Sequence, residues 1–170
     1  MKTTYNSKSV SRALAFLLSA AATALASAAD WRIPENAPLL THWASEISPT
    51  HALPEYPQPQ LIRDRWQNLN GLWDYAVTDK HEENIPSAYA GKILVPYPIE
   101  SALSGVMQPF LPTQRLWYHR IVTIPESWRG QRILLHFGAV DWQTTVYLNG
   151  QNLGQHRGGY DGFTFDLTKA

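Results

Sequence analysis

The last third of the chain shows a two-residue alternation of side chains that is typical of β-strands. In residues 116–124 one face carries Trp117, His119, Ile121 and Thr123, and the other carries Tyr118, Arg120, Val122 and Ile124. We expect a strand over the whole of this segment. Shorter apolar runs predict further strands at residues 72–77, 92–95, 132–137 and 163–167.

A tight hairpin is predicted between two alternating runs, residues 145–148 and 151–154. Asn149 and Gly150 separate the two runs. A type I′ turn needs a positive φ at both of its central residues, and Asn followed by Gly adopts that conformation most readily. The sequence therefore predicts an antiparallel pair of strands over residues 143–155.

The segments between these strands are polar or rich in turn residues, as at residues 79–91 and 101–114. Beyond residue 28, no amphipathic stretch of about ten residues indicates a helix. Short strands joined by such loops favour an all-β fold, a β-sandwich of the jelly-roll type. Residues 29–62 are predicted to be an extended lead-in, because prolines disfavour helices and strand ladders. These prolines are at positions 34, 38, 49, 54, 57 and 59.

Residues 1–28 have the pattern of a secretory signal peptide. A basic start is followed by an apolar, alanine-rich stretch at 13–25 and by the small residues Ala26, Ser27 and Ala28. We expect cleavage after Ala28 and export of the protein to the periplasm or the medium. The apolar stretch is shorter than the ~20 residues that a membrane-spanning helix needs, so no stable membrane anchor is expected.

Composition and charge limit the possible classes of function and the forces that can hold the fold. Removing Lys2, Lys8 and Arg12 with the signal peptide reduces the 14 basic residues to 11 against 14 acidic ones, which gives a net charge of −3. A mildly acidic chain without a basic run is poorly suited to binding nucleic acid. There is no cysteine, so a packed core rather than disulfides must hold the fold. All seven tryptophans lie beyond residue 28, which predicts an aromatic core.

Four short motifs occur in order along the chain. They are QNLNGLWDY at 67–75, LWY at 116–118, VYLNG at 146–150 and GGYDGF at 158–163. As an ordered set they resemble the amino-terminal domain of glycoside hydrolase family 2, which includes β-galactosidases, β-glucuronidases and β-mannosidases. The likeness runs from residue 63 to the end of the chain. It implies a galactose-binding-like jelly roll over residues 63–170, incomplete at its carboxyl-terminal end.

The resemblance also implies the domains of a longer parent enzyme, an immunoglobulin-like sandwich and a (β/α)₈ barrel. Two glutamates of that barrel hydrolyse glycosidic bonds with retention. No residue of this chain corresponds to them, so no catalytic residue is expected here. We expect the non-catalytic amino-terminal domain of an exported β-glycosidase, inactive alone, which supports the barrel and shapes the sugar site. Its partners would be the missing domains and carbohydrate. The alternative is a free-standing carbohydrate-binding module without hydrolytic activity.

The best candidate for a binding loop is residues 156–161. After His156 it contains Arg157, Gly158, Gly159, Tyr160 and Asp161. The glycines let the backbone approach another surface closely, and Tyr160 offers a flat ring with a hydroxyl at its tip. Three interpretations stay open: contact with another domain of the same polypeptide, packing within the fold, and direct contact with a sugar. The Asp161 carboxylate is suited to accept hydrogen bonds from sugar hydroxyls or from the backbone amides of its own turn.

Other candidate groups favour structural roles. Trp117, Trp142 and Tyr147 are expected in the core rather than on a carbohydrate platform. Glu82 and Glu83 are neighbours in a polar loop and would point apart, which predicts a solvated loop instead of a catalytic pair.

Asp166 is expected to accept hydrogen bonds from loop amides. The histidines at 42, 51, 81, 119, 136 and 156 are scattered, although His119 and His136 lie on different predicted strands that can meet. No metal site, phosphate loop, serine-nucleophile motif or cofactor is expected.

Overall fold

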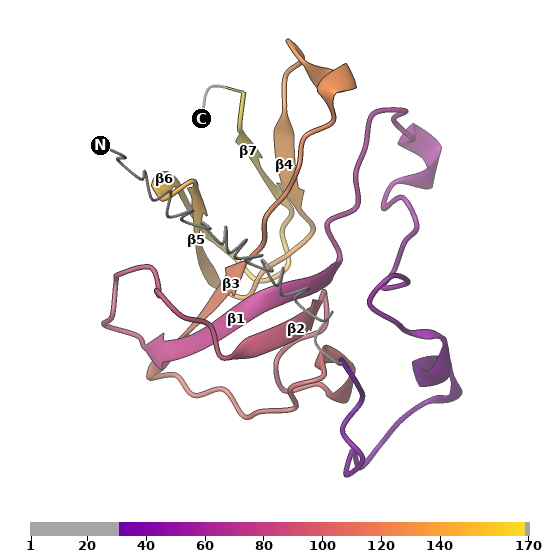
Figure 1. Cartoon of the computed structure of the whole chain (residues 1–170), viewed down its shortest axis with the longest axis vertical. Coiled ribbons are helices and arrows are strands. Elements are labelled where there is room, and N and C mark those ends of the chain that lie inside the picture. Colours follow the sequence, from indigo (N-terminus) through magenta and orange to yellow (C-terminus); the bar gives the residue numbers. More distant parts are fainter. Residues whose placement is uncertain (1–30, 169–170) are drawn as a thin grey trace, which may run out of the picture.

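The computed structural model describes residues 31–168, and the predicted signal peptide with its cleavage site lies outside them. Along the chain (Figure 1) the elements are η1 (His42–Glu46), η2 (Pro59–Leu61), β1 (Gly71–Asp79), β2 (Gly91–Val95), η3 (Ala102–Ser104), β3 (Gln114–His119), η4 (Glu126–Trp128), β4 (Leu134–Phe137), β5 (Gln143–Leu148), β6 (Gln151–Arg157) and β7 (Phe163–Asp166). The η elements are 3₁₀ turns of at most five residues, and the strand pairs are antiparallel. The prediction of an all-β fold is therefore confirmed for the described residues. No helix among them has the length and apolarity needed to cross a bilayer.

Strand β1 is the centre of a three-stranded sheet with the order β2-β1-β3. Its register places Tyr75 beside Gly91 of β2 on one side and beside Tyr118 of β3 on the other. Ile93 and Leu94 follow each other in β2, so their side chains point to opposite faces of the sheet. Both are fully buried. The sheet is therefore covered on both faces at β2.

Strands β5 and β6 form the predicted hairpin. Asn149 has a φ of 51° and Gly150 a φ of 82°, as a type I′ turn requires. The ladder runs from Leu148 beside Gln151 to Gln143 beside Arg157, with one shift of register near Val146. The hairpin prediction is confirmed, including the position of its turn.

The third sheet pairs β4 with β7 and packs against the hairpin. The ring of Phe163 in β7 stacks on His156 of β6, with ring centres 4.2 Å apart. The hairpin also approaches the three-stranded sheet, because Tyr147 of β5 lies 6.1 Å from the Trp117 ring of β3. In Figure 1 the three-stranded sheet lies below, and the two smaller sheets stand above it.

The lead-in is irregular and carries two 3₁₀ turns, η1 and η2. Hydrogen bonds fix it to the rest of the domain at two places, to η3 and to the segment just before β1. The indole N–H of Trp31 donates to the carbonyl of Leu103 at 3.1 Å, and the amides of Asn68 and Asn70 both donate to the carbonyl of Leu53. Figure 1 shows this segment along the side of the molecule away from the β5–β6 hairpin.

The strand predicted over residues 116–124 differs from the structure. Strand β3 begins two residues earlier, at Gln114 beside Asp79, and ends at His119. Beyond it, Ile121 is 85% exposed, and no strand among residues 31–168 pairs with this segment. The side-chain alternation continues, but a strand also needs a hydrogen-bonded neighbour. Alternation alone therefore overestimated the length of β3.

Candidate functional site

The predicted binding loop joins β6 to β7. Arg157 is the last residue of β6, and Gly158 follows with a φ of 135°, a conformation that glycine adopts without strain. This turn brings the Gly158 N–H to the carbonyl of Trp142 at 2.8 Å. Trp142 belongs to the loop between β4 and β5. One backbone hydrogen bond thus ties the two loops together.

Four side chains of these two loops and that of Arg157 at the end of β6 form what we call the loop surface: Asp141, Trp142, Arg157, Tyr160 and Asp161. The guanidinium carbon of Arg157 lies 5.9 Å from the centre of the Trp142 ring, within cation–π range. A Cβ atom at residue 159 would lie 2.7 Å from Asp141 Oδ1, so the Asp141 carboxylate rests directly on Gly159. The loop surface therefore exists because Gly159 has no side chain.

Both aromatic rings of the loop surface are accessible to solvent. Trp142 is 60% exposed and Tyr160 is 99% exposed. The exposure of Tyr160 excludes packing of its ring within the described part of the fold, which leaves contact with another domain and contact with a sugar. The prediction that Trp142 belongs to the core is wrong, because this residue lies in a loop beyond the end of β4.

Apart from the contact of the Arg157 guanidinium with the Trp142 ring, the polar groups of the loop surface are unengaged within the described residues. Within residues 31–168 the side chains of Asp141, Arg157, Tyr160 and Asp161 make no hydrogen bond or ion pair. Two carboxylates, one guanidinium and one phenol are thus free to accept or donate hydrogen bonds to a ligand.

His156 belongs to the predicted loop by sequence but is packed inward. Its ring stacks on Phe163, and its Nε2 atom is inaccessible to solvent. Across the ladder, the hydroxyl of Thr144 faces the same layer and is also inaccessible. Neither atom has a hydrogen-bond partner among the residues that the structure describes. His156 therefore supports the loop surface from below and does not belong to it.

Trp117 and Tyr147 pack within the fold but are not among its fully buried residues. The buried hydrophobic residues of the described part are aliphatic, so the prediction of an aromatic core is wrong. Both are half-buried, and the Trp117 indole N–H donates to the Thr78 hydroxyl at 2.9 Å. An indole whose donor is already satisfied by a neighbouring strand is a packing residue. These two rings contribute to the junction between β3 and β5.

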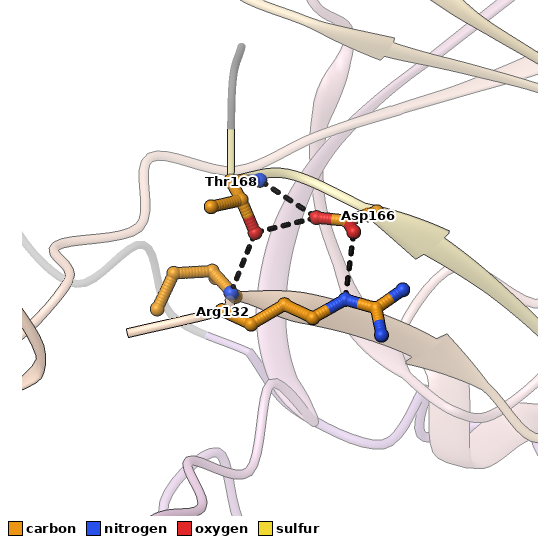
Figure 2. Close-up of polar contacts among 4 residues, drawn as sticks. Arg132, Asp166 and Thr168 are labelled. Carbon is orange, nitrogen blue, oxygen red and sulfur yellow. Dashed lines mark hydrogen bonds and ion pairs between the residues drawn. The ribbon is translucent and has the colours of Figure 1, made fainter. Parts of the chain in front are cut away.

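Asp166, at the end of β7, forms a second polar cluster with Arg132 and Thr168 (Figure 2). Its Oδ1 accepts the Thr168 backbone N–H at 3.0 Å and the Thr168 hydroxyl at 2.5 Å, and its Oδ2 accepts Arg132 Nε at 2.8 Å. The Thr168 hydroxyl in turn accepts the N–H of Ile133. The bonds from Thr168, and then the one from Arg132, lower the pKa of Asp166 to about 2. The expected bonding of Asp166 to a loop amide is confirmed.

A third cluster, which the sequence did not indicate, crosses the three-stranded sheet. Asp74 of β1 lies between Lys92 of β2 and His119 of β3, with Lys92 Nζ at 2.6 Å and His119 Nδ1 at 3.2 Å from its carboxylate oxygens. Tyr89 stacks on the His119 ring. Burial would raise the pKa of Asp74, but the hydrogen bonds from Lys92 and His119 outweigh it and hold that pKa below its usual value. Only the strand register, unknown from sequence, brings these three residues together.

The other predicted groups stay apart. Glu82 and Glu83 are exposed in the loop after β1, and a Glu82 carboxylate oxygen accepts the backbone N–H of Asn84 at 2.9 Å. The predicted solvated loop is thus confirmed. His136 bonds to Thr164 and not to His119. No group of three or more histidine, aspartate or glutamate side chains in residues 31–168 is placed to hold a metal ion.

Residues 66–170 match the model of a family described as glycosyl hydrolases family 2, sugar binding domain. A β-galactosidase of Thermoanaerobacter pseudethanolicus is 38% identical over 53 residues, which cover 31% of this chain and 7% of that protein. A β-glucuronidase of Paenibacillus borealis is 23% identical over 119 residues, covering 67% of this chain and 20% of that protein. The solved structure of a Faecalibacterium prausnitzii β-glucuronidase matches with a TM-score of 0.50 and 32% identity, over 61% of this chain and 18% of that one.

This chain therefore spans a fifth or less of the length of these relatives. The resemblance drawn from the ordered sequence motifs is confirmed. The matched family domain is a β-sandwich, so the predicted fold class is confirmed as well. The division of the chain at residues 28 and 62 stays a prediction.

Proposed function

Because the chain belongs to glycoside hydrolase family 2 through its sugar-binding domain, we propose that it serves as the non-catalytic amino-terminal domain of an exported, retaining β-glycosidase. In this role it supports the catalytic barrel and shapes access to the sugar site. The observation that carries the proposal is the match of residues 66–170 to this one domain, together with the small share of each relative that the chain spans.

The carboxylates of the described residues support a non-catalytic role. Retaining glycosidases place two carboxyl groups about 5–5.5 Å apart on either side of the scissile bond. Asp74 and Asp166 are held in ion pairs, and Glu82 and Glu83 lie in an exposed loop. Asp141 and Asp161 lie on the open loop surface and are both exposed to solvent.

An activity assay tests the non-catalytic role. The purified chain is incubated with the 4-nitrophenyl β-glycosides of glucuronic acid, galactose and mannose, and release of nitrophenol is followed. We expect no release above the rate without protein. Turnover that Asp141→Asn or Asp161→Asn abolishes would contradict the proposal. In the organism that encodes the chain, an antibody against it is expected to detect a β-glycosidase much longer than 170 residues.

Export is tested separately. Expressed in a bacterium with its own first 28 residues, the protein is expected in the exported fraction with Ala29 as its first residue, as read by mass spectrometry of the amino-terminal peptide. The matched control is Ala28→Arg, which removes the small residue that a signal peptidase requires and is expected to block cleavage. An unprocessed native sequence in the cytoplasm would contradict this part of the proposal.

A second candidate function is a carbohydrate-binding module that acts without a catalytic barrel. The exposed rings of Trp142 and Tyr160 favour it, because they lie on two loops joined by a hydrogen bond and exposed apolar groups that cluster mark interaction sites. The antibody experiment distinguishes the two functions. A free-standing module would be detected as a short polypeptide without associated glycosidase activity.

A further inference from the structure

We propose that the loop surface binds a neutral sugar directly, with Trp142 and Tyr160 stacking on pyranose rings and with Asp141, Arg157 and Asp161 bonding to their hydroxyls. The site goes beyond the role of supporting a barrel, and it applies whether the chain acts alone or within a longer enzyme. Its residues come from two loops separated by a whole hairpin.

The first argument is that the two loops are preorganised. The β4–β5 loop and the β6–β7 loop begin and end at paired residues, since Phe137 faces Phe163 and Gln143 faces Arg157 in their ladders. The rings of Phe137 and Phe163 are stacked with centres 4.8 Å apart. The hydrogen bond from Gly158 to Trp142 then closes the gap between the loops. A site on a rigid base loses little freedom when a ligand binds.

The second argument concerns the chemical nature of the exposed groups. One face of a pyranose ring consists of C–H bonds and is apolar, whereas its edge carries hydroxyls that both donate and accept. Trp142 and Tyr160 supply flat apolar faces. The carboxylates of Asp141 and Asp161 accept hydrogen bonds, and the guanidinium of Arg157 donates them. None of these polar groups has a hydrogen-bond partner within residues 31–168, so a sugar competes there with water and with the contact of Arg157 on the Trp142 ring.

The third argument decides the class of sugar. The loop surface carries two carboxylates and one guanidinium, so its local charge is negative. A uronic acid would bring a further negative charge toward Asp141 and Asp161, and like charges repel. A neutral sugar meets no such cost and uses both carboxylates as acceptors. The expected ligand is therefore a neutral hexopyranoside.

Docking of another protein surface, including another domain of a longer polypeptide, is the main competing interpretation. Trp, Tyr and Arg are enriched in protein interfaces, but Asp is depleted there. Two unpaired carboxylates beside the aromatic rings favour the hydroxyl-rich ligand. Protein docking becomes an outcome of the test.

The test titrates the full chain with β-linked gluco-, galacto- and manno-oligosaccharides, with methyl β-glucuronide as the anionic probe. Tryptophan fluorescence and calorimetry report binding. We expect saturable binding of at least one neutral oligosaccharide, weakened roughly tenfold or more by Trp142→Ala, equal to about 1.4 kcal/mol. Tyr160→Ala, which removes a ring that touches nothing, is expected to weaken binding without affecting folding. The matched control is Trp43→Ala, because Trp43 is also 60% exposed but lies in η1. It is expected to leave binding unchanged.

Several results would overturn the proposal. They are the absence of saturable binding to every neutral sugar, a preference for the glucuronide, or equal losses in the Trp43 and Trp142 variants. Binding that persists when both Trp142 and Tyr160 are alanine would also overturn it, and so would flat sugar titrations accompanied by capture of a protein partner through these two residues. None of these results alters the expected lack of turnover, so the site and the proposed function fail independently.

Discussion

The two ends of strand β7 carry polar clusters of similar composition that differ in their hydrogen bonding. At its start, the loop surface gathers two carboxylates and a guanidinium that bond to nothing in the described part of the chain. At its end, four residues beyond Gly162, Asp166 accepts from Thr168 and Arg132, and Thr168 accepts from Ile133. A cluster whose hydrogen bonds are satisfied within the fold holds strands together. A cluster whose bonds are unsatisfied at the surface is available for a ligand.

Exposure alone does not separate the two clusters, because Asp161 and Asp166 are both exposed aspartates. The difference lies in the neighbours that the backbone supplies. Beyond β7 the chain turns so that Thr168 reaches back to Asp166, whereas Gly158 and Gly159 offer no side chain to Asp141 or Asp161. Four variants and a titration test this difference.

The largest effect is expected from Phe163→Ala, which affects both clusters. The ring of Phe163, at the start of β7, stacks on the rings of His156 and Phe137. Removing the ring leaves a cavity under the loop surface and loosens β7, at a cost of about 3 kcal/mol, the lower end for a core phenylalanine because this one is half-buried. Urea unfolding measures the loss, and Phe163→Leu is expected to recover part of it. A loss of unfolding free energy below about 0.5 kcal/mol, the level of an ordinary surface substitution, would contradict a packing role for the Phe163 ring.

The second largest effect is expected from Thr168→Val, which removes hydrogen bonds from the Asp166 cluster and leaves the loop surface unchanged. Valine keeps the shape of threonine but neither donates to Asp166 nor accepts from Ile133. The amide of Ile133 is therefore expected to exchange its hydrogen faster, and so is that of Leu167, which donates to the Ile133 carbonyl. Hydrogen exchange followed by NMR measures both. Thr123→Val is the control, since this exposed threonine has no comparable bonds, and equal changes in the two variants would refute a role for the cluster.

The pH dependence of Asp166 gives a third, smaller effect. An unfolded aspartate titrates near 3.9, and the bonds from Thr168 and Arg132 lower the pKa of Asp166 to about 2 in the folded chain. Its bonds therefore stabilise the fold fully above about pH 4, and this contribution is lost as the pH falls through about 2. Carboxyl ¹³C NMR is expected to show the low midpoint. In Thr168→Val the midpoint is expected to rise, and a native midpoint near 4 would show that the cluster does not form.

The smallest effect on stability is expected from Asp141→Asn and Asp161→Asn. Each replaces an unengaged carboxylate at the surface, so the free energy of unfolding is expected to change by no more than about 0.5 kcal/mol. The same variants are expected to weaken sugar binding, because an amide is a poorer acceptor than a carboxylate. A loss of stability as large as that of Thr168→Val would remove the distinction between the two clusters.

Much of the fold could be read from local sequence. The turn at Asn149 and Gly150 follows from the backbone conformation that these two residues allow, and the apolar runs located β1, β2, β4 and β7 to within a few residues. The length of β3 could not be read in this way. It ends at His119, beside Asp74 of β1, where the pairing with β1 stops, and side-chain alternation does not record that.

Only one of the two loops of the loop surface could be predicted from the sequence. The glycines and Tyr160 identified the β6–β7 loop, but Asp141 and Trp142 lie on another loop and had no distinguishing pattern. Their place beside Arg157 and Gly159 follows from the β5–β6 ladder, in which Gln143 faces Arg157. That register includes a shift between Val146 and Tyr147, which the turn residues alone do not indicate. The exposure of Trp142 likewise follows from its position beyond β4.

The single backbone bond between Gly158 and Trp142 has a consequence for how this domain can diverge. An insertion or deletion in either loop displaces one end of the bond and so moves the residues of the other loop. Related domains that keep the bond should change the lengths of both loops in concert, and those that lose it are free to vary each one separately. Anyone grafting a new specificity onto this scaffold would have to transplant the two loops as a unit.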